Sequence, residues 1–117
     1  MAQSGLDYRA IFDAWPAPAA ILDVELKYHA CNVSYEAVSR RSRRDLVGRA
    51  LFEIFPGGDH AQKEALMRSF RQVARTGKPH HITNAAYDFT IPGGQTLARK
   101  WTTSNIPLFS ASGELNG

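Results

Sequence analysis

The sequence has little of what marks several common classes of protein. Among its 117 residues there is one cysteine, Cys31, which excludes an internal disulfide framework and is typical of a reducing compartment. No apolar run approaches the roughly 20 residues that cross a bilayer, and residues 1–5 lack the basic and then apolar pattern of a signal peptide. We therefore expect a single cytoplasmic domain that makes no membrane contact.

The net charge of the chain is also small. The chain has 14 Lys and Arg residues against 11 Asp and Glu residues, a formal net charge of +3, which is less than a dedicated nucleic-acid binder usually carries. A basic cluster lies within residues 40–44, and it consists of Arg40, Arg41, Arg43 and Arg44. No aromatic side chains are interleaved there for base stacking. We interpret the cluster as a solvated loop and expect no direct contact with nucleic acid.

The motifs of common catalytic sites are absent as well. There is no Gly-x-Ser-x-Gly, no phosphate-binding loop and no His-Glu-x-x-His. His80 and His81 are adjacent, so on a strand they would point to opposite faces, and no Cys or carboxylate stands at ligand spacing. We interpret both as surface histidines. The sequence predicts no catalytic residue and no metal site, and a small α+β enzyme is the least favoured alternative.

The first part of the chain contains short apolar segments of helix and strand type. Residues 6–15 are expected to form a helix with a large apolar stripe, which ends at Pro16. The apolar run 19–24 has the length of a strand, and residues 26–31 alternate with period two, so the two predict a hairpin. Asn32 is a good N-cap for a helix over about 33–40.

The second part is expected to hold the longest helix and two long strands. Residues 60–75 keep Leu66, Phe70 and Val73 on one face and charged side chains on the other. Two strands are predicted over 80–91 and 96–109, joined by a turn at Pro92-Gly93-Gly94-Gln95. Strands at both ends of the chain with helices between them favour an α+β fold with an antiparallel sheet.

These segments, in this order, resemble a PAS domain. The matching stretches are 19–23, 30–35, 44–49, 51–56, 76–79, 101–108 and 112–114. The resemblance implies a five-stranded antiparallel sheet with helices over one face, formed by residues 18–117, and an N-terminal helix and flank in residues 1–17. In the family the fifth strand follows the turn that Ser112-Gly113-Glu114 matches, and we expect that strand to be short or missing here.

The resemblance implies a regulatory role. PAS domains sense small molecules, redox state or light, form dimers and pass a signal to a linked output domain. By this resemblance the chain is a sensor domain of a bacterial signal-transduction protein, either a histidine kinase of a two-component system or a helix-turn-helix transcription regulator. The alternative is a PAS domain with a filled core that holds no ligand and only mediates dimerisation.

Two sets of candidate residues follow. The side chains expected around a pocket between sheet and helices are Tyr28, Phe52, Phe55, Leu66, Phe70, Tyr87, Trp101 and Asn105. The Asn105 amide and the two Tyr hydroxyls would orient a small, mostly apolar ligand, although the same side chains would equally fill a closed core. The residues expected at a homodimer interface are Leu6, Ile11 and Trp15.

The resemblance also bears on cofactors. Haem-binding PAS domains take an axial His from the long helix, where the matching position is Leu66, and His60 lies at the start of that helix. Flavin-binding light sensors place a reactive Cys just after the Gly-Arg of a short helix, and residues 48–51 are Gly-Arg-Ala-Leu. Cys31 lies elsewhere and is interpreted as a buried thiol. Haem and covalently bound flavin are disfavoured, and no other cofactor is indicated.

Overall fold

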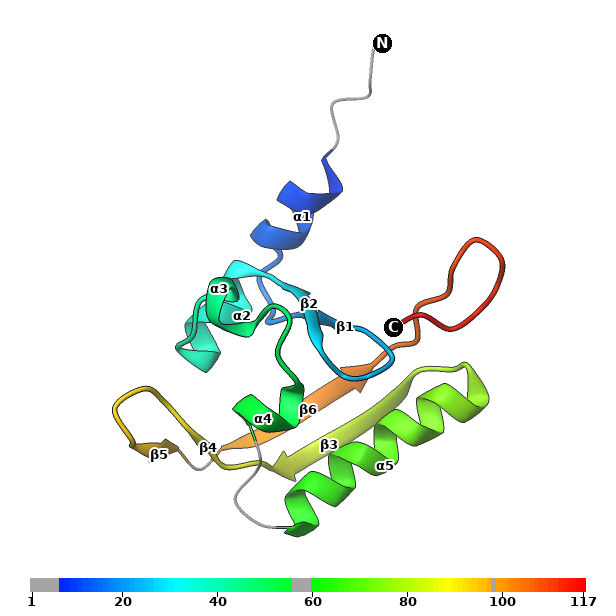
Figure 1. Ribbon diagram of the computed structural model, residues 1–117. Helices are drawn as coiled ribbons and strands as arrows, with labels where there is room; N and C mark the ends of the chain where they lie inside the picture. The colour runs from blue at the N-terminus through cyan, green and yellow to red at the C-terminus, as the bar shows by residue number, and fades with distance from the viewer. Residues whose placement is uncertain (1–6, 56–59, 98) are drawn as a thin grey trace.

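Short helices and strands follow one another in nearly the order that the sequence predicts (Figure 1). The structure is a computed structural model that describes residues 7–55, 60–97 and 99–117. Its elements are α1 (Tyr8–Ala14), β1 (Ala20–Leu22), β2 (Tyr28–Cys31), α2 (Val33–Ser39), α3 (Arg43–Leu46), α4 (Leu51–Ile54), α5 (His60–Thr76), β3 (His80–Ala86), β4 (Phe89–Thr90), β5 (Thr96–Leu97) and β6 (Lys100–Asn105). In the described part of the chain, no helix is both long enough and apolar enough to cross a membrane.

All strand pairing is antiparallel, which confirms the predicted fold class. The described strands form three pairs, β1 with β2, β3 with β6 and β4 with β5. Within the described residues, no strand lies between β1 and β6. After the turn at Ser112 and Gly113, Leu115 makes an isolated bridge to Phe109, and Leu108 exchanges backbone hydrogen bonds with Asn116 and Gly117. These few residues stand in place of the expected fifth strand.

The two long C-terminal strands are more interrupted than predicted. The register of β3 on β6 shifts between Ile82 and Ala85, where β3 has one residue more than β6. Such a bulge reverses which side chains of β3 face the helices on either side of it. Beyond Ala86 the amide of Tyr87 donates to the carbonyl of Arg99 (2.9 Å), and β4 and β5 then continue the hairpin. The predicted turn is confirmed, and Gly93 and Gly94 supply its positive φ angles.

Asn32 connects the start of α2 to the chain that leads into β1. It is the N-cap of α2, as predicted, and its Oδ1 accepts from the amides of Tyr35 (2.9 Å) and Ala19 (3.0 Å). Its Nδ2 donates to the carbonyl of Ala17 at 2.9 Å. Asn32 is fully buried, so the three hydrogen bonds satisfy a polar side chain that would otherwise be costly to bury.

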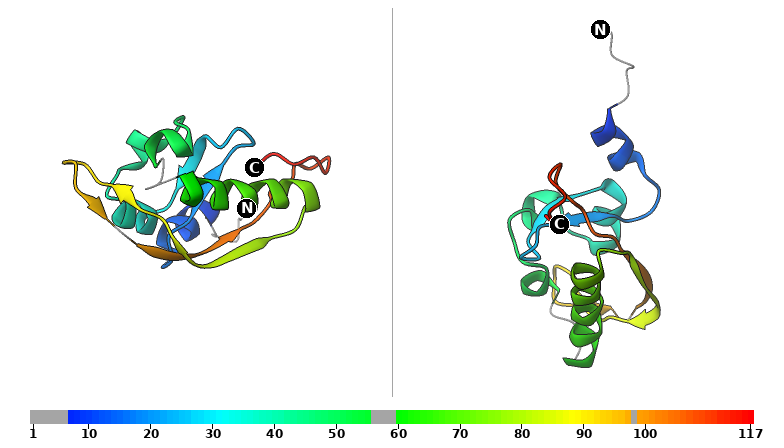
Figure 2. Two further views of the ribbon diagram at one scale, coloured as in Figure 1. Left: turned by 90° about the horizontal axis from the view of Figure 1, so that it is seen from below. Right: turned by 90° about the vertical axis from the view of Figure 1, so that its right-hand side faces the viewer.

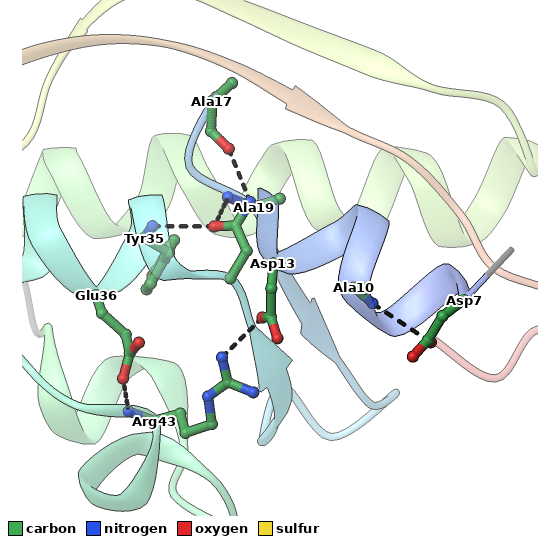
Figure 3. Close-up of polar contacts among 9 residues, drawn as sticks. Asp7, Ala10, Asp13, Ala17, Ala19, Tyr35, Glu36 and Arg43 are labelled. Atoms are coloured by element: carbon green, nitrogen blue, oxygen red, sulfur yellow. Dashed lines mark hydrogen bonds and ion pairs between the residues drawn. The ribbon is translucent and has the colours of Figure 1, made fainter. Parts of the chain in front are cut away.

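Helix α1 projects from the rest of the molecule (Figure 1). None of its residues is buried, and Ile11 and Trp15, two of the predicted interface residues, are 42% and 57% exposed. The third, Leu6, lies outside the described residues. The carboxylate of Asp13 forms an ion pair with Arg43 on α3 (2.7 Å), which ties α1 to the body (Figure 3).

Helix α5 lies along β3 and β6 (Figure 2). Its buried residues are Ser69 and Val73, and Gly77 ends it with a positive φ of 66°, as predicted from the sequence. The helices α2, α3 and α4 stand on the side of β1 and β2. The buried residues of the main core are Tyr28, Cys31, Leu46, Leu51, Phe55 and Ile91.

Candidate functional site

A cavity of about 830 Å³ separates β1 from β6 and extends beneath α5. Its wall is mostly apolar, and it continues into a second space of about 300 Å³ beside the C-terminal half of α5. The larger volume falls in the range of pockets that hold small molecules in proteins. The cavity borders the free edges of two strand pairs, so side chains from both halves of the molecule face it.

Seven of the eight predicted pocket residues lie around this cavity. They are Tyr28, Phe55, Leu66, Phe70, Tyr87, Trp101 and Asn105. The eighth, Phe52, packs against Phe70 with ring centroids 6.5 Å apart and beneath the ammonium of Lys63, and it is not among the lining residues. Helix α4 is one turn long, and Leu51 and Phe55 are the residues of this segment that line the cavity. Phe52 lies on a different side of that turn.

The tyrosine hydroxyls on the wall are bonded within the protein. Tyr28 and Tyr35 share a hydrogen bond of 2.5 Å, with their rings in an edge-to-face arrangement. The hydroxyl of Tyr87 donates to the carbonyl of Phe55 at 2.5 Å. The sequence analysis missed Tyr35, although its position three residues after the Asn32 N-cap places it on the first turn of α2, facing β2. These hydroxyls hold the wall together rather than standing ready for a ligand.

The wall carries no charge in the described part of the chain. No Asp, Glu, Lys, Arg or His side chain is among the lining residues of the larger cavity. Burial raises the pKa of Tyr35 and that of Tyr87 to about 12, and burial together with Tyr35 raises the pKa of Tyr28 further. All three phenols are therefore neutral at physiological pH. A charged ligand would find no counter-charge on this wall, whereas a neutral ligand loses little hydration free energy when it enters.

At the end of β6 the wall has a polar group with supporting residues that the sequence analysis missed. The Nδ2 of Asn105 donates to the hydroxyl of Ser69 (2.8 Å), which lies 2.6 Å from Nδ1 of His80. His80 is half-buried, so its interpretation as a surface residue is wrong, while His81 is exposed and contacts Ser104. Ser69 carried a usable signal, since it falls in the apolar stripe of α5.

The residues considered for cofactors and for nucleic acid, Cys31, His60 and the arginine cluster, lie outside the cavity wall. Cys31 is buried, and burial raises the pKa of its thiol. His60 is exposed at the start of α5, whereas Leu66 lines the cavity. The basic cluster is less solvated than expected, because Arg41 stacks on the ring of Phe55 (4.7 Å) and donates to a backbone carbonyl. Among the described residues, no three His, Cys, Asp or Glu side chains gather as a metal site requires.

Comparison with known proteins gives a consistent result. A family model described as PAS fold matches residues 12–117. Among curated protein sequences, none matches this chain. Solved structures do match, and at the identities found their likeness shows the fold.

Three of these structures illustrate the likeness. The PAS domain of a protein from Colwellia psychrerythraea superposes with a TM-score of 0.71 at 12% identity, over 94% of this chain and 87% of that chain. The PAS domain of BvgS from Bordetella pertussis gives 0.64 at 24% identity, over 93% and 76%. VqmA of Vibrio cholerae gives 0.69 at 21% identity, over 96% of this chain and 48% of VqmA. The chain thus spans about half the length of VqmA.

Proposed function

This chain belongs to the PAS family, and from that premise we propose that it is a regulatory sensor domain that binds a small molecule in the cavity between β1, β6 and α5. We propose residues 18–117 as the sensing unit and residues 1–17 as a flank that transmits the signal. The domain then has no chemistry of its own, and its output depends on whether the cavity is occupied.

One observation carries this proposal, the cavity of about 830 Å³ with an uncharged, mostly apolar wall. The likeness to VqmA, of which one structure is described as bound to DPO, supports a ligand role for the corresponding region here.

The same geometry suggests how occupancy reaches α1. Trp15 directly follows α1 and, with Ala17 and Ala19, contributes to the cavity wall. Ala17 and Ala19 are in turn bonded to the buried Asn32. A ligand that contacts Trp15 favours the orientation of α1 to which it binds more tightly. The shift in free energy equals the difference between its binding free energies for the two orientations.

Native mass spectrometry, compared with the denatured mass, tests for a bound molecule. We expect a recurring non-covalent adduct in the wild-type protein that is lost in Leu66→Trp, because the indole fills the cavity. Arg68→Trp, at an exposed position of the same helix, is the matched control and should keep the adduct. A wild-type protein that shows no adduct, together with a Leu66→Trp variant destabilised by about 1–3 kcal/mol, would instead support a filled core that holds no ligand.

We also propose that the domain self-associates through α1, with a second copy of this chain as the occupant. Tyr8, Ile11 and Trp15 are exposed on or beside a helix that has no buried residue. One VqmA structure is described as a dimer, which supports this assembly. In sedimentation experiments Ile11→Lys should shift the protein to monomer, whereas Val24→Lys, at an exposed apolar position in the β1–β2 turn, should not. Equal behaviour of the two variants would remove α1 from the interface.

A linked output domain completes the proposal. The similar proteins include BvgS and the LuxR-type receptor VqmA, and on this basis we propose a histidine kinase or a helix-turn-helix regulator as the output of the parent protein. Reading the gene downstream of the codon for Gly117 tests this directly. A long helix with heptad periodicity and a His-containing segment would indicate a kinase, and a helix-turn-helix would indicate a DNA-binding regulator.

A further inference from the structure

Three polar side chains from three elements meet at the edge of the cavity. Ser69 of α5 is 1% exposed, and its hydroxyl lies between the Asn105 amide of β6 (2.8 Å) and the His80 ring of β3 (2.6 Å). His80 and Asn105 are directly paired across the β3–β6 ladder, so their side chains share one face of it. Ser69 contacts both because it belongs to the stripe of α5 that packs on this face.

The Asn105 amide is turned so that its nitrogen faces Ser69. An amide has two donors on nitrogen and an acceptor on oxygen, and Asn105 uses its nitrogen to donate to Ser69. The Ser69 hydroxyl can then donate its own hydrogen to Nδ1 of His80, which gives every member of the chain a partner. Within the described part of the chain, Oδ1 of Asn105 has no hydrogen-bond partner, and Asn105 lines the cavity.

The other polar groups that the sequence predicts for ligand contact are already used. Tyr28 is bonded to Tyr35, and Tyr87 donates to the carbonyl of Phe55. Of the eight predicted pocket residues, Asn105 is therefore the one that offers a polar atom without a partner in the described part of the chain, and in this orientation that atom is an acceptor. The surrounding wall is uncharged and mostly apolar.

We propose that Asn105 is the specificity-determining residue of the cavity, and that its ligand is a small, neutral, mostly apolar molecule with a hydroxyl or N–H group that donates to Oδ1. Ser69 and His80 are positioning residues that keep the amide nitrogen away from the ligand. This inference rests on the proposed function, since it assumes that a molecule enters the cavity.

Indole and benzofuran are suitable probes, because the two bicyclic molecules have nearly the same shape and differ in a ring N–H against a ring oxygen. Their dissociation constants can be measured by NMR titration, with the side-chain N–H of Trp101, on the cavity wall, as a reporter. We expect wild-type protein to favour indole. The preference, expressed as the ratio of the two constants, should fall about tenfold in Asn105→Leu, which removes the acceptor at similar size.

Two further variants separate acceptor from scaffold. Asn105→Asp keeps an acceptor oxygen and should keep the preference for indole. Ser69→Ala leaves the amide in place but free to turn, and should lower the ratio by a smaller factor. Thr103→Val, on the same face of β6 and also on the wall, is the matched control and should leave the ratio unchanged. Binding of benzofuran by each variant shows that its cavity is intact.

The possible results are distinct. A wild-type protein that binds both probes, with a ratio that Asn105→Leu does not alter, overturns this inference and leaves the proposed function standing. A wild-type protein that binds neither probe overturns both. A ratio that falls in Asn105→Leu and Ser69→Ala but holds in Asn105→Asp supports the assignment.

Discussion

The two halves of the molecule differ in how completely they are packed. Around β1, β2 and the short helices, here called the closed half, the buried residues are Tyr28, Cys31, Asn32, Ser39, Leu46, Leu51 and Phe55. In the open half, built from α5, β3 and β6, the inward side chains Leu66, Phe70 and Trp101 are only half-buried, although residues of both halves line the cavity. The closed half can therefore carry most of the stability, and the side chains of the open half would bury more apolar surface when a ligand is bound.

The largest expected effect belongs to the closed half. Leu46 on α3 is fully buried, so Leu46→Ala should lower the free energy of unfolding by about 3 kcal/mol, through lost apolar burial and the void that remains. Urea denaturation measures this. Val47→Ala, at the next and largely exposed position, should cost less than about 0.5 kcal/mol. A small loss for Leu46→Ala would mean that the two halves do not differ.

Asn32→Ala should come next, at about 2 kcal/mol, because it removes an N-cap and three part-buried hydrogen bonds. Asn32→Asp keeps the Oδ1 acceptor and should cost less. The same denaturation series compares them. If the two substitutions were equally damaging, the contact with the Ala17 carbonyl would outweigh the cap.

The predictability of the two halves differs in the same way. Local signals gave the N-cap at Asn32, the end of α5 at Gly77 and the turn at Gly93 and Gly94, because each depends on a few neighbouring residues. The side of the sheet that His80 faces depends instead on a bulge at Ile82. A one-residue shift in register reverses the faces of a strand, and the alternation of residues along the sequence does not reveal it.

For the candidate site, the sequence predicted several residues that lie around the cavity but not which of their polar groups are already paired. Aromatic residues of the right parity, such as Tyr87 and Trp101, do line the cavity. Which hydroxyls are already paired depends on contacts between distant segments, for example the bond from Tyr87 to Phe55. Those contacts exist only after folding, so the sequence suggested tyrosines as ligand contacts that the structure shows to be engaged.

Phe70→Ala tests the open half by comparing its loss of stability with that of Leu46→Ala. A fully buried Phe typically costs 3–5 kcal/mol when truncated, but Phe70 is half-buried at the cavity, and we expect about 1.5 kcal/mol. The loss should therefore be smaller than that of Leu46→Ala, although the side chain is larger. The reverse order in the same denaturation series would show that the open half is the better packed.

Alkaline pH tests the tyrosines where the halves meet. The pKa of Tyr35 is raised to about 12 by burial, above the ordinary value of about 10. Between these values the unfolded chain loses the phenolic proton and the native protein keeps it, so stability falls as pH rises above about 10. Tyr35→Phe should reduce this loss by about 1 kcal/mol at pH 11. An identical pH dependence in both proteins would contradict the burial of this phenol.

The smallest effect should come from the ion pair between Asp13 and Arg43, which joins α1 to the body at 2.7 Å. Both side chains are partly exposed, and such pairs add little to global stability. The hydrogen bond to Asp13 raises the pKa of Arg43, and an ion pair at the surface is weakened by salt. Asp13→Asn should leave the unfolding midpoint unchanged.

A local measurement is needed to see the consequence. Because no residue of α1 is buried, the pair is one of few restraints on that helix, and hydrogen exchange of the α1 amides should speed up in Asp13→Asn and in wild type at high salt. Asp45→Asn, which alters a contact with Ser42 on α3, is the control and should leave α1 unaffected. Unchanged exchange in Asp13→Asn would mean that α1 is held by the backbone around Asn32, and that a ligand must act through that buried side chain.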